Sequence, residues 1–201
     1  LNTVFQNIYA FFIGNRVGLV ALGYYTQADK WSKMGVMSLS QVLTSSFLPV
    51  LSKDQDDPAR FAAATARMNR LTAYLLFPAM GFLAVMATPI FHALFGTKWD
   101  AAIALFQLLL LRGVFTVLCQ LYNNYILALG RSRLLVITEA LRDGVALAAI
   151  VATLPVIALS GPDDVVEGVR IFLWGQVGAT FVAWSATLIM TVRVVGSHAS
   201  C

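Results

Sequence analysis

Residues 101–130, AAIALFQLLLLRGVFTVLCQLYNNYILALG, form one long apolar run in which Arg112 is the only charged side chain. About 20 residues of helix cross the hydrocarbon core of a bilayer, which is roughly 30 Å thick. The run lacks the alternation of apolar and polar residues that marks a barrel strand, and a helix satisfies its own backbone hydrogen bonds in lipid. It therefore predicts a membrane-spanning helix with a charge near its middle.

The rest of the chain repeats this pattern. Hydrophobic residues make up 59% of the 201 residues and charged residues 12%, and the mean hydropathy is +0.76. A soluble domain of this composition would have too little polar surface. We predict an all-α polytopic membrane bundle with about six transmembrane helices, near residues 1–23, 34–52, 71–95, 101–129, 134–159 and 170–192.

This bundle is expected to occupy residues 1–195, with a short tail at 196–201. The first span begins at Leu1, with neither an initiator Met nor the basic flank of a signal peptide. We therefore expect the chain to be cut from a longer protein.

Basic residues in the expected connections predict the orientation, because cytoplasmic loops carry more Lys and Arg. Seven such residues fall on one side, namely Lys53, Arg60, Arg67, Arg70, Arg131, Arg133 and Arg193, and four on the other, namely Lys30, Lys33, Lys98 and Arg170. We place the first group and both chain ends in the cytoplasm. The net charge of +4 then reflects topology rather than nucleic-acid binding.

Two features are predicted at the membrane surfaces. Asp57 and Pro58 have the N-cap and N1 pattern, and a basic amphipathic helix is expected to lie on the inner leaflet from there until the chain turns into the third span. Aromatic side chains are expected in interfacial belts, at Tyr24, Tyr25, Trp31, Trp99 and Trp174.

Residue types that would indicate catalysis or a cofactor are not clustered. The sequence has no GxxxxGK[ST] phosphate loop and no GxSxG elbow, and His92 and His198 stand alone. Cys119 falls inside a span and Cys201 is the last residue, so neither a metal site nor a disulfide is indicated. We predict that the chain is not an enzyme and binds no cofactor or metal.

Polar residues inside the spans are the candidate site residues, because such groups are costly in lipid and normally face the bundle interior or a wet cavity. They are Arg16 in the first span and Glu139 and Arg142 with Asp143 in the fifth. In the second span Ser38, Gln41 and Ser45 share one helical face, and in the fourth Arg112, Thr116, Gln120 and Asn123 lie along another, with Asn124 close by. Arg112 is the strongest candidate, since it lies far from both ends of its segment.

Structural roles are open for several of these residues. Gly14 and Gly18 around Arg16 have the GxxxG spacing of close helix packing. Glu139 and Arg142, three positions apart, can form an internal ion pair. Arg16 and Arg142 can also extend toward an interface. The hydroxyl groups of residues 34–52 are expected to form hydrogen bonds between helices.

Four motifs, in this order along nearly the whole chain, carry a family resemblance. They are LGYYxxA at 22–28, which is expected to form a turn, FLPVLSKxQDDP ending at Pro58, LFGxKW at 94–99 and an LGRS turn at 129–132. Together they resemble the C-terminal half of Wzx-like polysaccharide and lipopolysaccharide flippases of the MOP superfamily. Many relatives have a basic residue immediately after Ile-Gly, whereas Arg16 stands one position later, after Asn15.

The resemblance implies one bundle of a two-bundle transporter that opens alternately to either side of the bacterial inner membrane. Such proteins move undecaprenyl-diphosphate-linked oligosaccharides to the periplasmic leaflet. The implied partners are this lipid-linked oligosaccharide, the lipid bilayer, the missing N-terminal half, a glycan polymerase and chain-length regulators. Arg112 first, and Arg16 or Arg142 next, would attract the diphosphate, while Gln120, Asn123 and Asn124 would bind sugars.

Three other functions stay open. A membrane polymerase or ligase would need a large periplasmic loop, whereas the expected outward loops are short. A multidrug antiporter of the same superfamily would favour unpaired carboxylates in the spans. A non-transporting scaffold of a glycan-assembly complex would tolerate a neutral residue at position 112.

Overall fold

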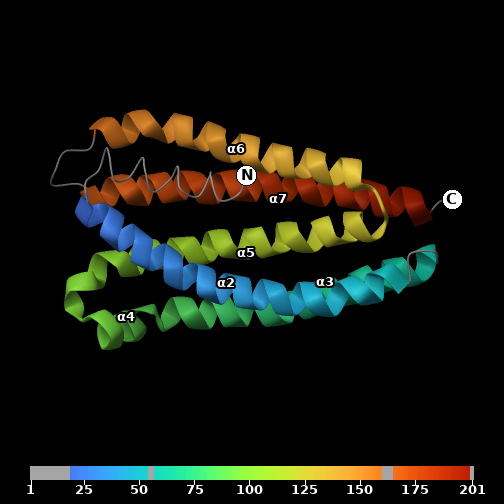
Figure 1. The fold of residues 1–201 in the computed structure, drawn as a ribbon, viewed down its shortest axis with the longest axis horizontal. Coiled ribbons are helices and arrows are strands. Elements are labelled where there is room, and N and C mark those ends of the chain that lie inside the picture. Colours follow the sequence, from blue (N-terminus) through green and yellow to red (C-terminus); the bar gives the residue numbers. More distant parts are fainter. Residues whose placement is uncertain (1–18, 54–56, 160–164, 200–201) are drawn as a thin grey trace.

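The computed structural model describes residues 19–53, 57–159 and 165–199 (Figure 1). The regular structure of these residues is entirely helical, so the predicted all-α fold is confirmed. The elements are α2 (Leu19–Lys53), α3 (Pro58–Val85), α4 (Ala87–Phe95), the short 3-10 helix η1 (Thr97–Trp99), α5 (Asp100–Ala128), α6 (Ser132–Leu159) and α7 (Val165–Ala199). Arg16, Gly14, Gly18 and most of the first expected span lie outside the described residues.

Helix α2 is one continuous helix of 35 residues, and this corrects the loop expected at 24–33 and the turn expected at 22–28. The charged residues of 24–33 predict a loop. These ten residues, however, include no Gly or Pro that would end a helix. Asp29 and Lys33, four residues apart, form an ion pair at 2.5 Å, which supports a helix rather than a loop.

Helix α3 begins as predicted and then continues farther than expected. The Asp57 side chain accepts hydrogen bonds from the backbone N–H groups of Ala59 and Arg60, each at 3.1 Å, as an N-cap does. The helix continues without interruption to Val85. The expected turn between a surface helix and the third span is therefore wrong, because no helix-breaking residue follows until Pro78.

Breaks in the helices occur at two other places. The expected span 71–95 divides at Met86 into α3 and α4. After α5, Gly130 adopts a positive φ of 68°, and the N–H groups of Gly130 and Arg131 donate to the carbonyls of Leu127 and Ile126. This Schellman arrangement ends α5 at the predicted LGRS turn. Helix α7 continues to Ala199, into the expected tail.

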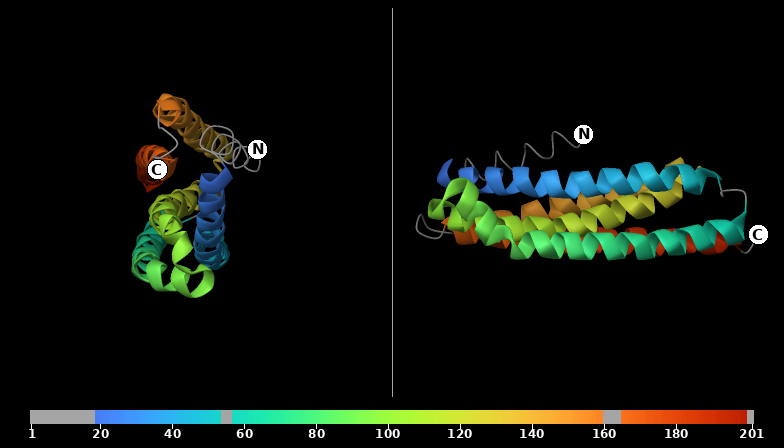
Figure 2. Two further views of the ribbon diagram at one scale, coloured as in Figure 1. Left: turned by 90° about the vertical axis from the view of Figure 1, so that its left-hand side faces the viewer. Right: turned by 90° about the horizontal axis from the view of Figure 1, so that it is seen from below.

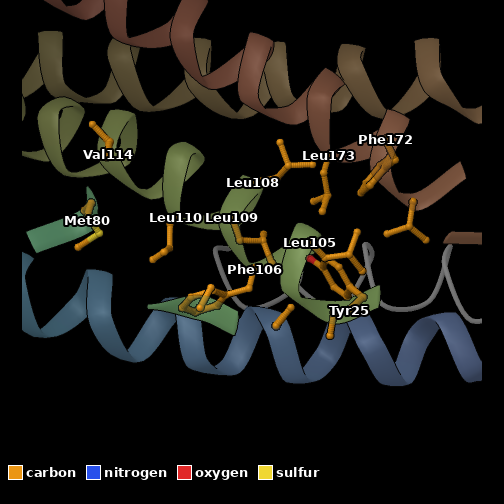
Figure 3. Packing of buried hydrophobic residues seen from close by; sticks show 14 of the residues in the cluster. Tyr25, Met80, Leu105, Phe106, Leu108, Leu109, Leu110, Val114, Phe172 and Leu173 are labelled. Atoms are coloured by element: carbon orange, nitrogen blue, oxygen red, sulfur yellow. The ribbon is translucent and has the colours of Figure 1, made fainter. Parts of the chain in front are cut away.

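Helix α5 is the centre of the bundle. It packs against α2 on one side and α7 on the other, while α6 packs mainly against α7 (Figures 1 and 2). Figure 3 shows the leucines of α5, including Leu105, Leu108 and Leu109, between Tyr25 of α2 and Phe172 of α7. Tyr25 is only 4% exposed, so it belongs to this core and not to an interfacial belt.

Three stretches of the described residues are long and apolar enough to cross a membrane, namely Ala59–Val85, Thr97–Ala128 and Glu167–Arg193. Helices α2 and α6 run alongside them (Figure 1). Large apolar side chains point away from the bundle, among them Phe82 and Val136, which are 64% and 68% exposed. Such a surface suits contact with lipid chains.

The two ends of the bundle carry different connections. The turn with Arg131 and the start of α3 with Arg60 lie at one end, which we call the Arg131 end (Figure 1). Helix η1 with Lys98 and the start of α7 with Arg170 lie at the other, the Lys98 end. Lys33 lies in neither connection, because α2 carries it within the bundle.

Candidate functional site

A polar cavity of about 360 Å³ lies among four helices. Polar and charged side chains supply most of its wall. They are Asp29, Ser32, Lys33, Ser40 and Gln41 of α2, Arg112, Thr116 and Gln120 of α5, Arg142 and Asp143 of α6, and Gln176 and Thr180 of α7. Because polar groups are costly among membrane helices, a concentration of this kind makes the cavity the candidate functional site.

Contacts of α2 with η1 and α5 give the depth of each group along the bundle. At the Lys98 end, Tyr24 Oη donates to the backbone carbonyl of Lys98 at 3.2 Å. Farther along, Ser40 Oγ donates to Gln120 Oε1 at 2.6 Å. The two helices therefore run side by side in the same direction. At 1.5 Å rise per residue, the cavity extends for about 16 Å, from the level of Asp29 to that of Gln120.

Arg112 lines the middle of this cavity. The next residue, Gly113, is buried where α2 crosses α5, and a Cβ built there would lie only 2.3 Å from Val36 Cγ2. The absence of a side chain at position 113 thus lets the two helices approach closely beside Arg112. Because Val36 and Met37 also line the cavity, this contact shapes the wall opposite Arg112.

Arg142 reaches the cavity from α6, together with acidic neighbours on its own helix. Its guanidinium contacts both carboxylate oxygens of Glu139, at 3.0 Å and 2.5 Å, and lies 3.3 Å from Asp143 Oδ1. The predicted internal ion pair between Glu139 and Arg142 is confirmed. Asp143 lines the cavity with Arg142, whereas Glu139 supports Arg142 from outside the wall.

Asn123 joins α5 to α6 rather than lining the cavity. Its Nδ2 donates to Glu139 Oε1 at 2.7 Å, and its Oδ1 accepts a hydrogen bond from Thr138 Oγ1 at 3.1 Å. Asn124 Nδ2 donates to Thr44 Oγ1 of α2 at 3.4 Å. The polar face predicted for residues 112–124 is therefore divided, and only its Arg112, Thr116 and Gln120 portion lines the cavity.

Replacing Asn123 with Ala is expected to lower the free energy of unfolding by about 1 kcal/mol, since two interhelical hydrogen bonds in a membrane protein contribute about that much. Thermal unfolding of the purified protein in detergent measures the loss. Asn124→Ala is the matched control, because its single long contact predicts a smaller effect. Equal losses in the two variants would contradict the role given to Asn123.

The hydroxyl groups of α2 agree in part with the expected hydrogen bonds between helices. Ser38 Oγ donates to the carbonyl of Met34 at 2.8 Å and Ser45 Oγ to that of Val42 at 3.2 Å, so both of these bonds stay within α2. Ser40 and Thr44 form the expected bonds between helices, with Gln120 and Asn124 of α5. Of the predicted face, only Gln41 lines the cavity.

Sequence reasoning missed six polar residues of the wall, namely Asp29, Ser32, Lys33, Ser40, Gln176 and Thr180. The loop predicted for 24–33 contains Asp29 and Lys33, so their helical spacing with residues 36, 37 and 40 is not considered in that prediction. Gln176 is a polar residue inside an apolar span, and this position is the sequence signal that could have identified it. In the structure its side chain is only 1% exposed.

The cavity offers three basic side chains at different depths, together with amides and hydroxyl groups. Arginine and lysine bind phosphate oxygens, and amide and hydroxyl groups bind sugar hydroxyls. Among the described residues, no three His, Cys, Asp or Glu side chains are grouped to hold a metal ion. The wall is therefore suited to an anionic, hydroxyl-rich solute.

The fold and the cavity together define a polytopic membrane protein with a polar cavity inside its helix bundle. Residues 1–104, just over half of the chain, match the family model described as polysaccharide biosynthesis protein. The chain belongs to this family, which agrees with the resemblance of its motifs to Wzx-like flippases.

Three curated proteins are similar over part of their length. The teichuronic acid biosynthesis protein TuaB of Bacillus subtilis is 27% identical over 134 residues, which are 67% of this chain and 28% of TuaB. An uncharacterized membrane protein in the cps region of Klebsiella pneumoniae is 24% identical over the same shares of both chains. The lipopolysaccharide biosynthesis protein WzxC of Escherichia coli is 25% identical over 57% of this chain and 23% of WzxC.

The aligned region thus spans about a quarter of the length of these relatives. No solved structure matches the chain.

Proposed function

We propose that the complete protein translocates undecaprenyl-diphosphate-linked oligosaccharide repeat units across the bacterial inner membrane, for lipopolysaccharide or exopolysaccharide synthesis. The observation that carries this proposal is Arg112, placed by a long apolar helix at the middle of a polar cavity. Membership of the polysaccharide biosynthesis family supports the substrate class.

In this mechanism the Arg112 guanidinium binds the diphosphate, whose oxygens match its planar set of N–H donors. The amides of Gln120 and Gln176 and the hydroxyl groups of the wall bind sugar hydroxyls. The polyprenyl chain stays in lipid, beside the apolar outer surface. A second bundle completes the cavity, and the two bundles open alternately toward each leaflet.

The orientation proposed for the chain has the Arg131 end in the cytoplasm and the Lys98 end in the periplasm, from the distribution of basic residues. A cargo loaded in the cytoplasmic leaflet then leaves toward Lys98. A glycan polymerase and chain-length regulators are the proposed partners after this release.

A cation antiporter is the second function to compare. Such a substrate would be held by carboxylates of the wall, and the cavity contains Asp29 and Asp143. Asp29 is paired with Lys33, and Asp143 lies beside Arg142. Because both carboxylates have basic partners, the wall favours an anionic cargo over a cationic one.

Mass spectrometry of undecaprenyl-linked glycans on each membrane leaflet tests the proposal. The comparison uses the source bacterium, a strain lacking the complete gene, and that strain with the gene restored. We expect finished lipid-linked repeat units to accumulate on the cytoplasmic leaflet only when the gene is missing. An unchanged lipid-linked pool with normal surface glycan would reject the flippase and favour the antiporter.

A further inference from the structure

The three basic groups of the cavity lie at three depths, and two of them are paired within their own helices. Lys33 is paired with Asp29 toward the Lys98 end, and Arg142 with Glu139 and Asp143 toward the Arg131 end. Arg112 lies between them, near the level of Val36. An anion that moves along the cavity therefore meets Lys33 after Arg112.

The Asp29–Lys33 pair differs from an ordinary surface pair. The two side chains are 18% and 34% exposed and both line the cavity beside Ser32, which is buried. By contrast, the pair of Glu167 and Arg170 on α7 is about half exposed and lies outside the cavity wall. The cavity side of α2 thus keeps a cation and its competing anion together along the path of the cargo.

We propose that Lys33 is a second binding point for the diphosphate of the lipid-linked cargo, and that Asp29 promotes its release at the Lys98 end. The inference rests on the proposed function. A diphosphate at this level competes with the Asp29 carboxylate for the Lys33 ammonium, since both anions bind the same N–H donors. When Asp29 binds Lys33 again, the cargo loses its contact and leaves.

This arrangement explains why a carboxylate stands in a cavity meant for an anion. Without Asp29, Lys33 would bind the diphosphate more strongly. Stronger binding that is equal before and after translocation does not raise the rate of the transport cycle. With Asp29 present, the cargo binds Lys33 only by competing with the Asp29 carboxylate. Asp29 therefore lowers the affinity for the cargo and promotes its release.

The test uses the full-length protein in phosphatidylcholine nanodiscs, with undecaprenyl diphosphate as the probe and native mass spectrometry as the binding measurement. Lys33→Gln is expected to weaken binding roughly tenfold, the effect of losing one charge-assisted hydrogen bond. Asp29→Asn is expected to strengthen binding about threefold, because the competing charge is removed. In proteoliposomes, both variants are expected to transfer the probe between leaflets more slowly than the wild-type protein.

Two matched variants control for changes in charge and packing. Lys30→Gln removes the same charge from an exposed neighbour outside the cavity, and Glu167→Gln breaks the pair on α7. Both are expected to leave binding and transfer unchanged. Adding phosphatidylglycerol to the nanodiscs separates the cargo from ordinary lipid phosphate. Preserved differences between the variants support a diphosphate site, and their loss would overturn it.

The outcomes distinguish this inference from the proposed function. Unchanged binding in Lys33→Gln, together with lost binding in Arg112→Gln, would overturn the second binding point and leave the flippase standing. Weaker binding or faster transfer in Asp29→Asn would overturn the release role. No binding of the probe by the wild-type protein would overturn both proposals.

Discussion

Replacing Arg112 with Gln is expected to lower the transfer of lipid-linked repeat units between leaflets by about a hundredfold, since a bidentate contact with the diphosphate provides two charge-assisted hydrogen bonds. Gln keeps much of the side-chain length but has no charge. Leaflet-resolved mass spectrometry, in cells that produce equal amounts of the complete protein, measures the change. The repeat units should accumulate on the cytoplasmic leaflet, as they do without the gene.

Two further variants test whether the loss of transfer is due to the guanidinium of Arg112. Arg112→Lys keeps the charge but not the planar fork of donors, so an intermediate rate is expected. Arg170→Gln removes a basic residue from outside the cavity wall and should leave transfer unchanged. Normal export in Arg112→Gln would contradict the role of this guanidinium and favour the scaffold that tolerates a neutral residue there.

Replacing Gly113 with Ala is expected to destabilise the bundle by about 1–3 kcal/mol, the usual cost of overpacking. The added Cβ would lie 2.3 Å from Val36 Cγ2 and 3.4 Å from Val36 Cβ. A β-branched side chain in a helix has little rotational freedom to move away, so α2 and α5 must separate. Thermal unfolding in detergent measures the stability, and leaflet transfer should fall with it because Val36 lines the cavity.

The contact predicts both a rescue and a control. Val36→Ala removes the clashing methyl groups, so the double variant with Gly113→Ala should recover much of the lost stability. Gly178→Ala places a Cβ where no atom lies within 4 Å, and Ala forms helix better than Gly, so its stability should be unchanged or higher. Similar losses at positions 113 and 178 would show that the close approach of α2 to α5 is unimportant.

Both proposals depend on the charged side chains of the cavity wall. Arg142 is held by Glu139 and Asp143, and Lys33 by Asp29. Arg112 lies on α5, whose run from 101 to 130 contains no acidic residue. The carboxylates that line the cavity with Arg112 therefore come from other helices, Asp29 from α2 and Asp143 from α6.

Local sequence was sufficient for the fold class and for part of the site. Long apolar runs predicted the helices, Asp57 and Pro58 predicted the start of α3, and Gly130 predicted the end of α5. The sequence also identified Arg112, Gln120, Arg142 and Gln41 as residues worth testing, and all four line the cavity. These signals are local, because solvation, capping and turn formation depend on residues a few positions apart.

Only the tertiary structure decided which polar side chains meet. It placed Asp29 and Lys33 of α2 in one cavity wall with residues of α5, α6 and α7. It also directed Asn123 to α6, and placed Ser40 beside Gln120, eighty positions away. The sequence by itself determined that the chain builds apolar helices with costly polar groups inside them. The partners of these groups were decided by packing, because the contact of α2 with α5 depends on how Val36 fits against Gly113 across the bundle.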